Sequence, residues 1–347
     1  MSEQPFFSII LPTKGRHWIW KYAISSLCTQ TFKDFEVIFV DNDDGVETAN
    51  NWFNIAYLLD SRFKYYRTGG LNMPDNWEYG LSKARGRFIY VLEDKGVLVP
   101  WALEQIYSLL TKQPCDSLVF LQSRHDFGPQ DKSAETRELP AINFNMQPVL
   151  DMAAQSIPAN DVIALFCNHG WNGIHDYIPR SINSVVSGSL VEVIKKRTGR
   201  FFHNLSPDFS SGLLTLDAIK EVQFLRYPLI SFFMTAQLSG GWRARANFKS
   251  GLNVLYSWGR EALQRMERTP CRYLPGIHNG LTADFIAMRD LSIGDLSSHS
   301  IPMEKYFAWL LGDINELEQS AGEDLSHLKA LVQRSFGDFV SAGRKSV

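Results

Sequence analysis

The first 120 residues show two patterns of apolar positions: short continuous apolar runs, and segments in which apolar residues recur at helical spacing. Continuous apolar runs closed by turn-forming or charged residues predict buried strands at Phe6–Leu11, Phe35–Val40, Phe63–Tyr66, Arg87–Leu92 and Ser117–Leu121. Between these runs, apolar residues recur at helical spacing over Ile19–Leu27, Glu47–Leu59, Asn76–Lys83 and Pro100–Leu110. Strands that alternate with helices in this order predict a mostly parallel sheet covered by helices.

Polar residues follow three of these strands directly. They are Thr13-Lys14, Asp41-Asn42 and Glu93-Asp94-Lys95. In open α/β sheets, ligands bind beyond the carboxyl ends of the strands, so these residues are the first candidates for a binding site. The segment that begins at Asp41 is also rich in turn-forming residues, so a plain turn is the alternative for that strand end.

The rest of the chain has a weaker pattern. Residues 122–185 contain several prolines and little periodicity, which favours a long loop-rich insertion. Ser187–Val191 is expected as a strand, Asp208–Ile219 as a helix and Tyr227–Phe233 as extended chain. Four further helices are expected at Leu252–Glu267, Leu281–Met288, Pro302–Leu317 and about Asp324–Val340.

Composition and motifs exclude several classes of protein. The chain has 347 residues, of which 45% are apolar and 21% charged, as in ordinary globular proteins. The 35 basic and 37 acidic residues nearly cancel, which argues against nucleic acid as a partner. No apolar run is long enough to span a membrane, and the four cysteines form no CxxC. Dinucleotide (GxGxxG), P-loop (GxxxxGK[ST]) and hydrolase (GxSxG) motifs are missing as well.

Several segments, taken in order, resemble a family-2 glycosyltransferase of the GT-A fold. They are SIILPTKGR (8–16), SSLCTQTFKDFEVIFVDN (25–42), LNMPDNWEYGLSKARGRFIYVLED (71–94), LVPWALE (98–104) and LSPDFSSGLLTLDAI (205–219). The resemblance implies an α/β, Rossmann-like GT-A domain over residues 1–230, which includes the insertion at about 122–185. A helical C-terminal region over residues 231–347 would follow it.

The resemblance also implies which residues bind a nucleotide-sugar donor linked to UDP, GDP or dTDP. Pro12, Thr13 and Arg16 would line the nucleotide pocket, and Asp41 would hydrogen-bond the base. Asp75 with Asn76 would lie near the nucleotide or the sugar.

Glu93 and Asp94 stand where the family places its metal and ribose ligands, so they are the candidates to hold Mg²⁺ or Mn²⁺. The next residue is Lys95, where the family commonly has a further aspartate. An ammonium at this point repels a divalent cation and can instead neutralise a diphosphate directly. Lys95 is therefore a candidate donor-binding residue, and it argues against a metal cofactor.

Asp208 aligns with the acidic residue that serves the family as general base. The implied reaction is inverting transfer of a sugar to a hydroxyl of a glycan or lipid-linked acceptor, as in polysaccharide biosynthesis. The implied setting is cytoplasmic, at the inner membrane face, with peripheral membrane contact. A simpler interpretation of Asp208 is an acidic residue that stabilises the first turn of a helix.

Two other functions remain open at the level of the sequence. Lys95 also fits a catalytically inactive nucleotide-sugar-binding or regulatory protein of the same fold. A nucleotidyltransferase has a similar sheet, but it usually carries a glycine-rich loop after the first strand, and residues 12–16 contain one glycine.

Overall fold

The computed structural model describes residues 4–43, 45, 60–126, 153–172, 174–203, 205–234, 248–257 and 259–347. The described strands are β1 (Phe7–Thr13), β2 (Phe35–Asp41), β3 (Phe63–Arg67), β4 (Phe88–Val91), β5 (Gly96–Leu98), β6 (Ser117–Asp126), β7 (Gln155–Pro158), β8 (Ser184–Ser187) and β9 (Glu221–Met234). The described helices are α1 (His17–Cys28), α3 (Met73–Lys83), α4 (Ala102–Lys112), α5 (Ala159–His169), α6 (Gly188–Thr198), α7 (Pro207–Ala218), α9 (Phe248–Ser257), α10 (Arg260–Met266), α11 (Ile277–Asp290), α12 (Met303–Ala321) and α13 (Ser326–Ser341), with a 3₁₀ turn at Asp295–Ser298.

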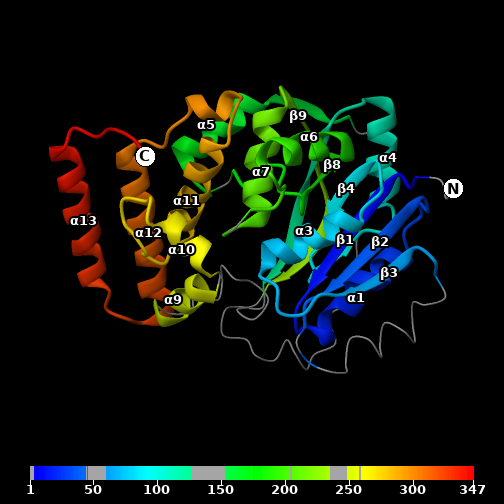
Figure 1. Cartoon of the computed structure of the whole chain (residues 1–347), viewed down its shortest axis with the longest axis horizontal. Helices are drawn as coiled ribbons and strands as arrows, with labels where there is room; N and C mark the ends of the chain where they lie inside the picture. The colour runs from blue at the N-terminus through cyan, green and yellow to red at the C-terminus, as the bar shows by residue number, and fades with distance from the viewer. Residues whose placement is uncertain are drawn as a thin grey trace.

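The described strands form one sheet in the order β3-β2-β1-β4-β8-β6-β9-β5, with β7 paired to β9 (Figure 1). β3, β2, β1 and β4 run parallel, as the alternating pattern predicts. β8 joins β4 antiparallel, and the remaining strands form a mixed half. The predicted α/β fold class is confirmed.

The first two strands are apolar because both faces of the sheet are covered. All residues of β1 and β2 are buried. Phe7, Ile9 and Leu11 belong to one hydrophobic cluster with α1 and α4, whereas Ile10 belongs to a second cluster with α3, α6 and α7. A strand buried on both faces reads as a continuous apolar run, which explains why the sequence located these strands well.

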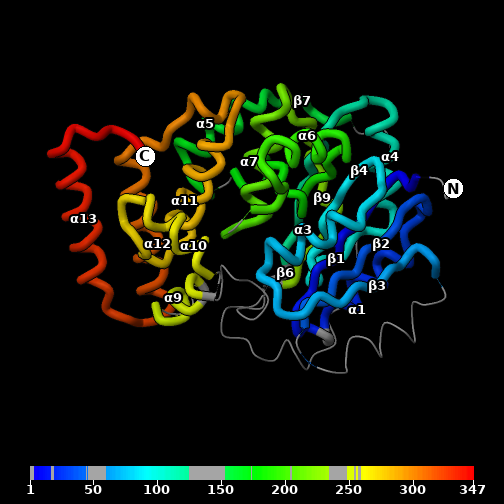
Figure 2. The backbone as a smooth tube through the Cα atoms, in the orientation of Figure 1, coloured from blue at the N-terminus to red at the C-terminus, as the bar shows by residue number. Residues whose placement is uncertain are grey.

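The C-terminal helices pack on the side of the molecule that carries α7. Figure 2 shows α11 between α12 and α7. Buried residues of α11, α12 and α13 share one hydrophobic cluster with α5, α7 and one face of the sheet. No helix among the described residues is long and apolar enough to cross a membrane.

Three sequence predictions about the elements need correction. Ser187–Val191 is not a strand: β8 ends at Ser187, whose hydroxyl accepts a hydrogen bond from the Leu190 N–H (3.2 Å) and caps α6. The helix expected over Leu252–Glu267 is two helices, α9 and α10, and Gly259 between them has φ of 85°. The segment 122–185 holds the helix α5 as well as loops. Residues 127–152 and 173 of it, and the whole of the helix expected at Glu47–Leu59, lie outside the described residues.

Candidate functional site

The carboxyl ends of β1 and β4 meet at Asp94. This side chain is buried, with 2% of the residue exposed. One of its oxygens accepts a hydrogen bond from the Thr13 hydroxyl (2.8 Å), and the other accepts one from the Arg16 guanidinium (2.8 Å). The charge of Asp94 raises the pKa of Arg16. The structure therefore brings together three of the residues that the sequence assigned to the donor pocket. Pro12, which the resemblance also assigned to the nucleotide pocket, lies inside β1 in register with Val40.

Glu93 and Lys95 form an ion pair at the same sheet edge. The Lys95 ammonium lies 3.2 Å from a carboxylate oxygen of Glu93 and 5.9 Å from the ring centre of Phe232 on β9. Lys95 is 7% exposed. Its charge is thus held inside the site and does not point into open solvent.

Asp208 is the second residue of α7, directly after Pro207. Its carboxylate lies 3.3 Å from the guanidinium of Arg180. Burial raises the pKa of Asp208, the charge of Arg180 opposes this rise, and the charge of Glu93 adds to it. The side chain still has 21% of its surface exposed, so a ligand can reach it. A carboxylate with a raised pKa is better suited to accept a proton near neutral pH.

Arg180 is a residue of this site that the sequence analysis missed. It is 4% exposed, and its guanidinium donates hydrogen bonds to the backbone oxygen of His175 (3.0 Å) and the side chain of Gln122 (3.0 Å). It also lies 5.0 Å from the ring centre of Trp171. Burial lowers the pKa of this guanidinium, and the charges of Asp208 and Glu93 oppose that effect. The available signal in the sequence was a single arginine that follows Ile178-Pro179 shortly before β8.

Asp41 ends β2 as predicted and is 2% exposed. Its carboxylate accepts hydrogen bonds from the Tyr65 hydroxyl (2.8 Å) and from the backbone N–H of Asp43 (3.0 Å). Burial and this contact raise the pKa of Tyr65. Thr68 donates its backbone N–H to the Asp41 carbonyl (2.8 Å) and its hydroxyl to Asn76 (2.6 Å), which joins Asn76 to the end of β2.

The side chain of Asp75 has a different partner from that of Asn76. Its carboxylate forms an ion pair with Arg200 (2.7 Å), and 41% of its side chain is exposed. Asp75 thus joins the start of α3 to the segment after α6, and a partner has to displace Arg200 or share the carboxylate with it.

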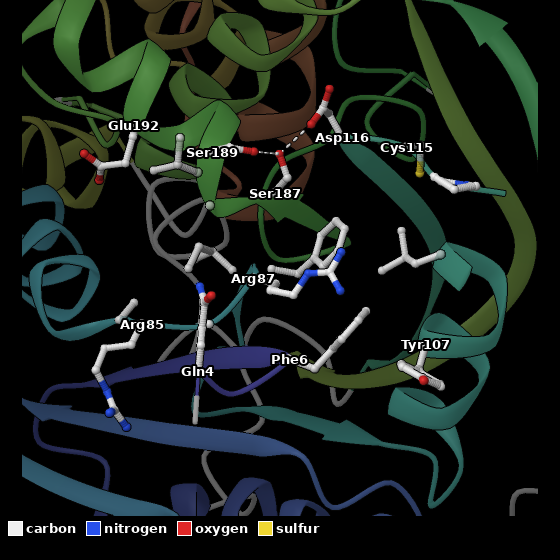
Figure 3. A pocket seen from close by; sticks show the side chains of 18 of the residues that line it. Gln4, Phe6, Arg85, Arg87, Tyr107, Cys115, Asp116, Ser187, Ser189 and Glu192 are labelled. Carbon is white, nitrogen blue, oxygen red and sulfur yellow. Dashed lines mark hydrogen bonds between the residues drawn. The ribbon is translucent and has the colours of Figure 1, made fainter. Parts of the chain in front are cut away.

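A wide cavity of about 920 Å³ lies at the opposite edge of the sheet, near the amino ends of β1 and β4 (Figure 3). Phe6, Arg87 and Tyr107 line it, and a hydrogen bond from Ser187 to Asp116 (2.6 Å) crosses one wall. None of the predicted site residues lines this cavity. It therefore contributes nothing to the arrangement around Asp94 and Asp208.

Residues 8–158 match the protein family described as "Glycosyl transferase family 2". The matched segment contains the group formed by Thr13, Arg16 and Asp94 and the pair formed by Glu93 and Lys95. The match ends before Arg180 and Asp208, so that part of the site comes from chain beyond the matched segment.

One curated relative is 32% identical over 104 residues, the "GalNAc(5)-diNAcBac-PP-undecaprenol beta-1,3-glucosyltransferase" of Campylobacter jejuni. The match covers 29% of this chain and 33% of that protein. Among solved structures, S. aureus TarS 1-349 in complex with UDP is 14% identical with a TM-score of 0.49, covering 97% of this chain and 92% of that one. The mannosyltransferase PcManGT from Pyrobaculum calidifontis in complex with GDP-Man and Mn²⁺ is 11% identical with a TM-score of 0.44, covering 97% and 87%.

The expected metal site does not fit the described side chains as they are arranged. The oxygens of Asp94 accept hydrogen bonds from Thr13 and Arg16, and Glu93 pairs with Lys95. Across the described residues, no group of three or more His, Cys, Asp or Glu side chains is placed to hold a metal ion. A divalent cation at Glu93 and Asp94 would have to displace or outweigh two positive side chains that already neutralise these carboxylates.

Proposed function

We propose that this chain transfers a sugar from a nucleotide-sugar donor to an acceptor hydroxyl with inversion. The match of residues 8–158 to the glycosyl transferase family 2 supports this reaction class. The observation that carries the proposal is the position of Asp208, a half-buried carboxylate with a raised pKa at the start of α7. It lies beside Arg180 and close enough to Glu93 for that charge to affect its pKa, which links α7 to the carboxyl edge of the parallel strands.

In this mechanism Asp208 is the general base. The acceptor hydroxyl attacks C1 of the donor sugar from the face opposite the leaving diphosphate. A bond forms between the hydroxyl oxygen and C1, the bond from C1 to the diphosphate oxygen breaks, and the hydroxyl proton passes to Asp208. Arg180 keeps the base ionised until the proton arrives, because its positive charge opposes the effect of burial.

Positive side chains stabilise the leaving diphosphate in this proposal. Arg16 and Lys95 both lie at the carboxyl edge of the strands, where such sheets bind ligands. Each is paired with a carboxylate in the structure, and a diphosphate that binds there would become a second partner for both. Fixed positive charge at the point where the leaving group becomes negative lowers the reaction barrier. Lys95 would thus take over part of the role of a metal ion.

The donor nucleotide would bind along the ends of β1 and β2. Asp41 is proposed to contact the base or ribose, with Pro12, Thr13, Asp75 and Asn76 as further parts of the donor pocket. UDP-, GDP- and dTDP-linked sugars are the candidate donors.

A lipid-linked glycan is the proposed acceptor, because the name of the curated relative describes a glucosyltransferase that acts on an undecaprenol-linked glycan. A cytoplasmic enzyme in peripheral contact with the inner membrane face would meet such an acceptor.

A nucleotide-sugar screen tests the proposal. UDP-glucose, UDP-N-acetylglucosamine, GDP-mannose and dTDP-rhamnose are added separately with and without Mn²⁺, and both the melting temperature and the release of free nucleotide are measured. A ligand at 100 times its Kd stabilises the native state by about 2.7 kcal/mol, which is readily seen as a rise in melting temperature. We expect one nucleotide class to stabilise the protein and to be slowly hydrolysed. Binding without any turnover, even with glycan acceptors present, would support the inactive binding protein instead.

A further inference from the structure

Helix α11 belongs to the C-terminal helices, outside the segment matched by the family, yet it contacts α7, which carries Asp208, and the segment around Trp171, whose ring lies against Arg180. It packs against α7, which begins with Pro207 and Asp208. It also lies against the segment around Trp171 through His278, the second residue of the helix. Figure 1 shows α11 beside α7 on the side away from β1 and β2.

Asp284 of α11 holds the start of α7. It is fully buried, and one of its oxygens accepts a hydrogen bond from the backbone N–H of Ser206 (2.8 Å), two residues before Asp208. The other oxygen makes no hydrogen bond among the described residues, and the guanidinium of Arg265 lies 3.6 Å from it. Ser206 occupies the cap position of α7, but its own side chain makes no capping bond, so the contact from Asp284 fixes this turn.

His278 of α11 holds the segment that supports Arg180. Its Nδ1 lies 2.7 Å from a carboxylate oxygen of Asp313, so the tautomer with the proton on Nδ1 leaves Nε2 free to accept. Nε2 accepts the backbone N–H of Trp171 at 3.3 Å. The Trp171 ring in turn lies against the Arg180 guanidinium. The approach is close, since a β-carbon added at Gly170 would lie 2.8 Å from the His278 ring.

Strained backbone occurs directly after Arg180 and directly before the start of α7. Ser181 follows Arg180 and has φ of 63°, and Leu205 precedes Ser206 and has φ of 75°. Only one other described non-glycine residue, Tyr273, has a positive φ. Such conformations persist where surrounding contacts determine them, and they concentrate at functional sites. Asp284 of α11 contacts Ser206, the residue directly after Leu205. His278 of α11 contacts Trp171, whose ring lies against Arg180, the residue directly before Ser181.

We propose that α11 is a positioning element of the active site: Asp284 sets the place of the general base Asp208, and His278 sets the place of Arg180. The inference rests on the proposed function. Both residues act through backbone groups of the neighbouring segments and touch neither donor nor acceptor.

The chain offers a matched control at the other end of α7. Asp217 is also buried, forms an ion pair with Arg197 (3.0 Å), and accepts hydrogen bonds from Ser292 and from the backbone N–H of Leu296 (3.1 Å). Like Asp284 it joins α7 to the C-terminal part of the chain, but it does so nine residues after Asp208. Loss of Asp217 therefore tests stability without disturbing the catalytic end of the helix.

The experiment compares Asp284→Ala, Asp284→Asn, His278→Phe and Asp217→Ala in the full chain. Turnover is measured with UDP-glucose, UDP-N-acetylglucosamine and GDP-mannose, and amide hydrogen exchange is followed around Ser206 and Trp171.

We expect Asp284→Ala to lower kcat by about 10²-fold with the donor KM unchanged, because a displacement of about 1 Å costs this much. Asp284→Asn keeps an oxygen for Ser206 and should recover most of the rate. His278→Phe keeps the stacking on Trp309 and should speed exchange around Trp171.

Two results would overturn the proposal. The first is a kcat for Asp284→Ala that falls no further than that of Asp217→Ala at matched thermal stability. The second is exchange around Ser206 in Asp284→Ala and around Trp171 in His278→Phe that stays at the wild-type rate. A wild-type chain that turns over no donor refutes the proposed function, and the exchange measurement still decides whether α11 positions these segments. If Asp284→Ala does not fold, Asp284→Asn and His278→Phe carry the test.

Discussion

Asp94 at the carboxyl edge of the parallel strands and Asp208 at the start of α7 are two aspartates of the candidate site that are held differently. Asp94 is 2% exposed and accepts two hydrogen bonds of 2.8 Å, one of them from a guanidinium. Asp208 is partly accessible, and its ion pair with Arg180 is longer, at 3.3 Å. Burial raises the pKa of Asp208, and only part of that rise is offset by its partner.

The two environments give Asp94 and Asp208 different chemical roles, although both are aspartates. A carboxylate whose two oxygens accept hydrogen bonds from Thr13 and Arg16 orders the residues around it. A partly accessible carboxylate with a raised pKa can accept a proton. Enzymes use different surroundings to give neighbouring carboxylates different roles.

The largest expected effect separates the two aspartates directly. Asp208→Asn keeps the shape of the side chain and removes the proton acceptor, so kcat should fall by about 10²–10⁴-fold while donor affinity stays near that of the wild type. Asp94→Asn should instead weaken donor binding, because the Arg16 guanidinium loses the carboxylate that holds it in place beside the proposed donor pocket. Steady-state kinetics and calorimetric titration with the donor measure both. Equal losses of kcat in the two variants would show that the comparison is wrong.

A smaller effect is expected from Lys95, which neutralises Glu93 in the structure. Lys95→Ala should weaken the binding of nucleoside diphosphates by about 10–100-fold, the equivalent of a lost hydrogen bond to a charged group. Wild-type activity should survive EDTA in substantial part, whereas Lys95→Asp should require Mn²⁺ or Mg²⁺. Wild-type transfer that stops in EDTA and returns with Mn²⁺ would show that Glu93 and Asp94 hold a metal after rearrangement.

Asp41 should matter for affinity alone. Asp41→Ala removes one polar contact to the donor and should weaken nucleotide binding by about tenfold, with kcat at saturation unchanged. Tyr65→Phe is the matched control, since it removes the hydroxyl that contacts Asp41 and leaves the carboxylate in place. Titration with UDP, GDP and dTDP provides the measurement. Wild-type affinity in Asp41→Ala for every nucleotide that binds would remove Asp41 from the donor pocket.

The smallest expected effect is a shift in pH dependence. The acidic limb of kcat/KM reports the pKa of the base, and it should lie above the ordinary range of an aspartate because burial disfavours the charged form. Arg180→Gln removes the positive charge that opposes burial, so the limb should move to higher pH. A shift to lower pH, or none, would indicate that Arg180 does not act on Asp208.

The sequence by itself determined the parallel half of the sheet and the strand ends that carry Thr13, Asp41 and Asp94. These features are local: a strand buried on both faces must be continuously apolar, and the polar residue after it must lie at the edge of the sheet. The family resemblance added Asp208 at the start of its helix. The sequence was wrong about Ser187–Val191, where a short apolar run fits the start of a helix as well as a strand, and a capping serine decided between them.

Only the tertiary structure decided what surrounds these side chains. Thr13 and Asp94 are 81 residues apart, Arg180 and Asp208 are 28 apart, and Ser206 and Asp284 are 78 apart. No periodicity links residues at such separations, since their contact depends on how whole elements pack. The helix at Leu281–Met288 was predicted and lies within α11, but its contacts with the start of α7 and with Trp171, and the place of Arg180, could not be read from the pattern. A buried charged side chain needs partners that compensate for its lost hydration, and these partners determine its chemical role. They come together only when the chain folds.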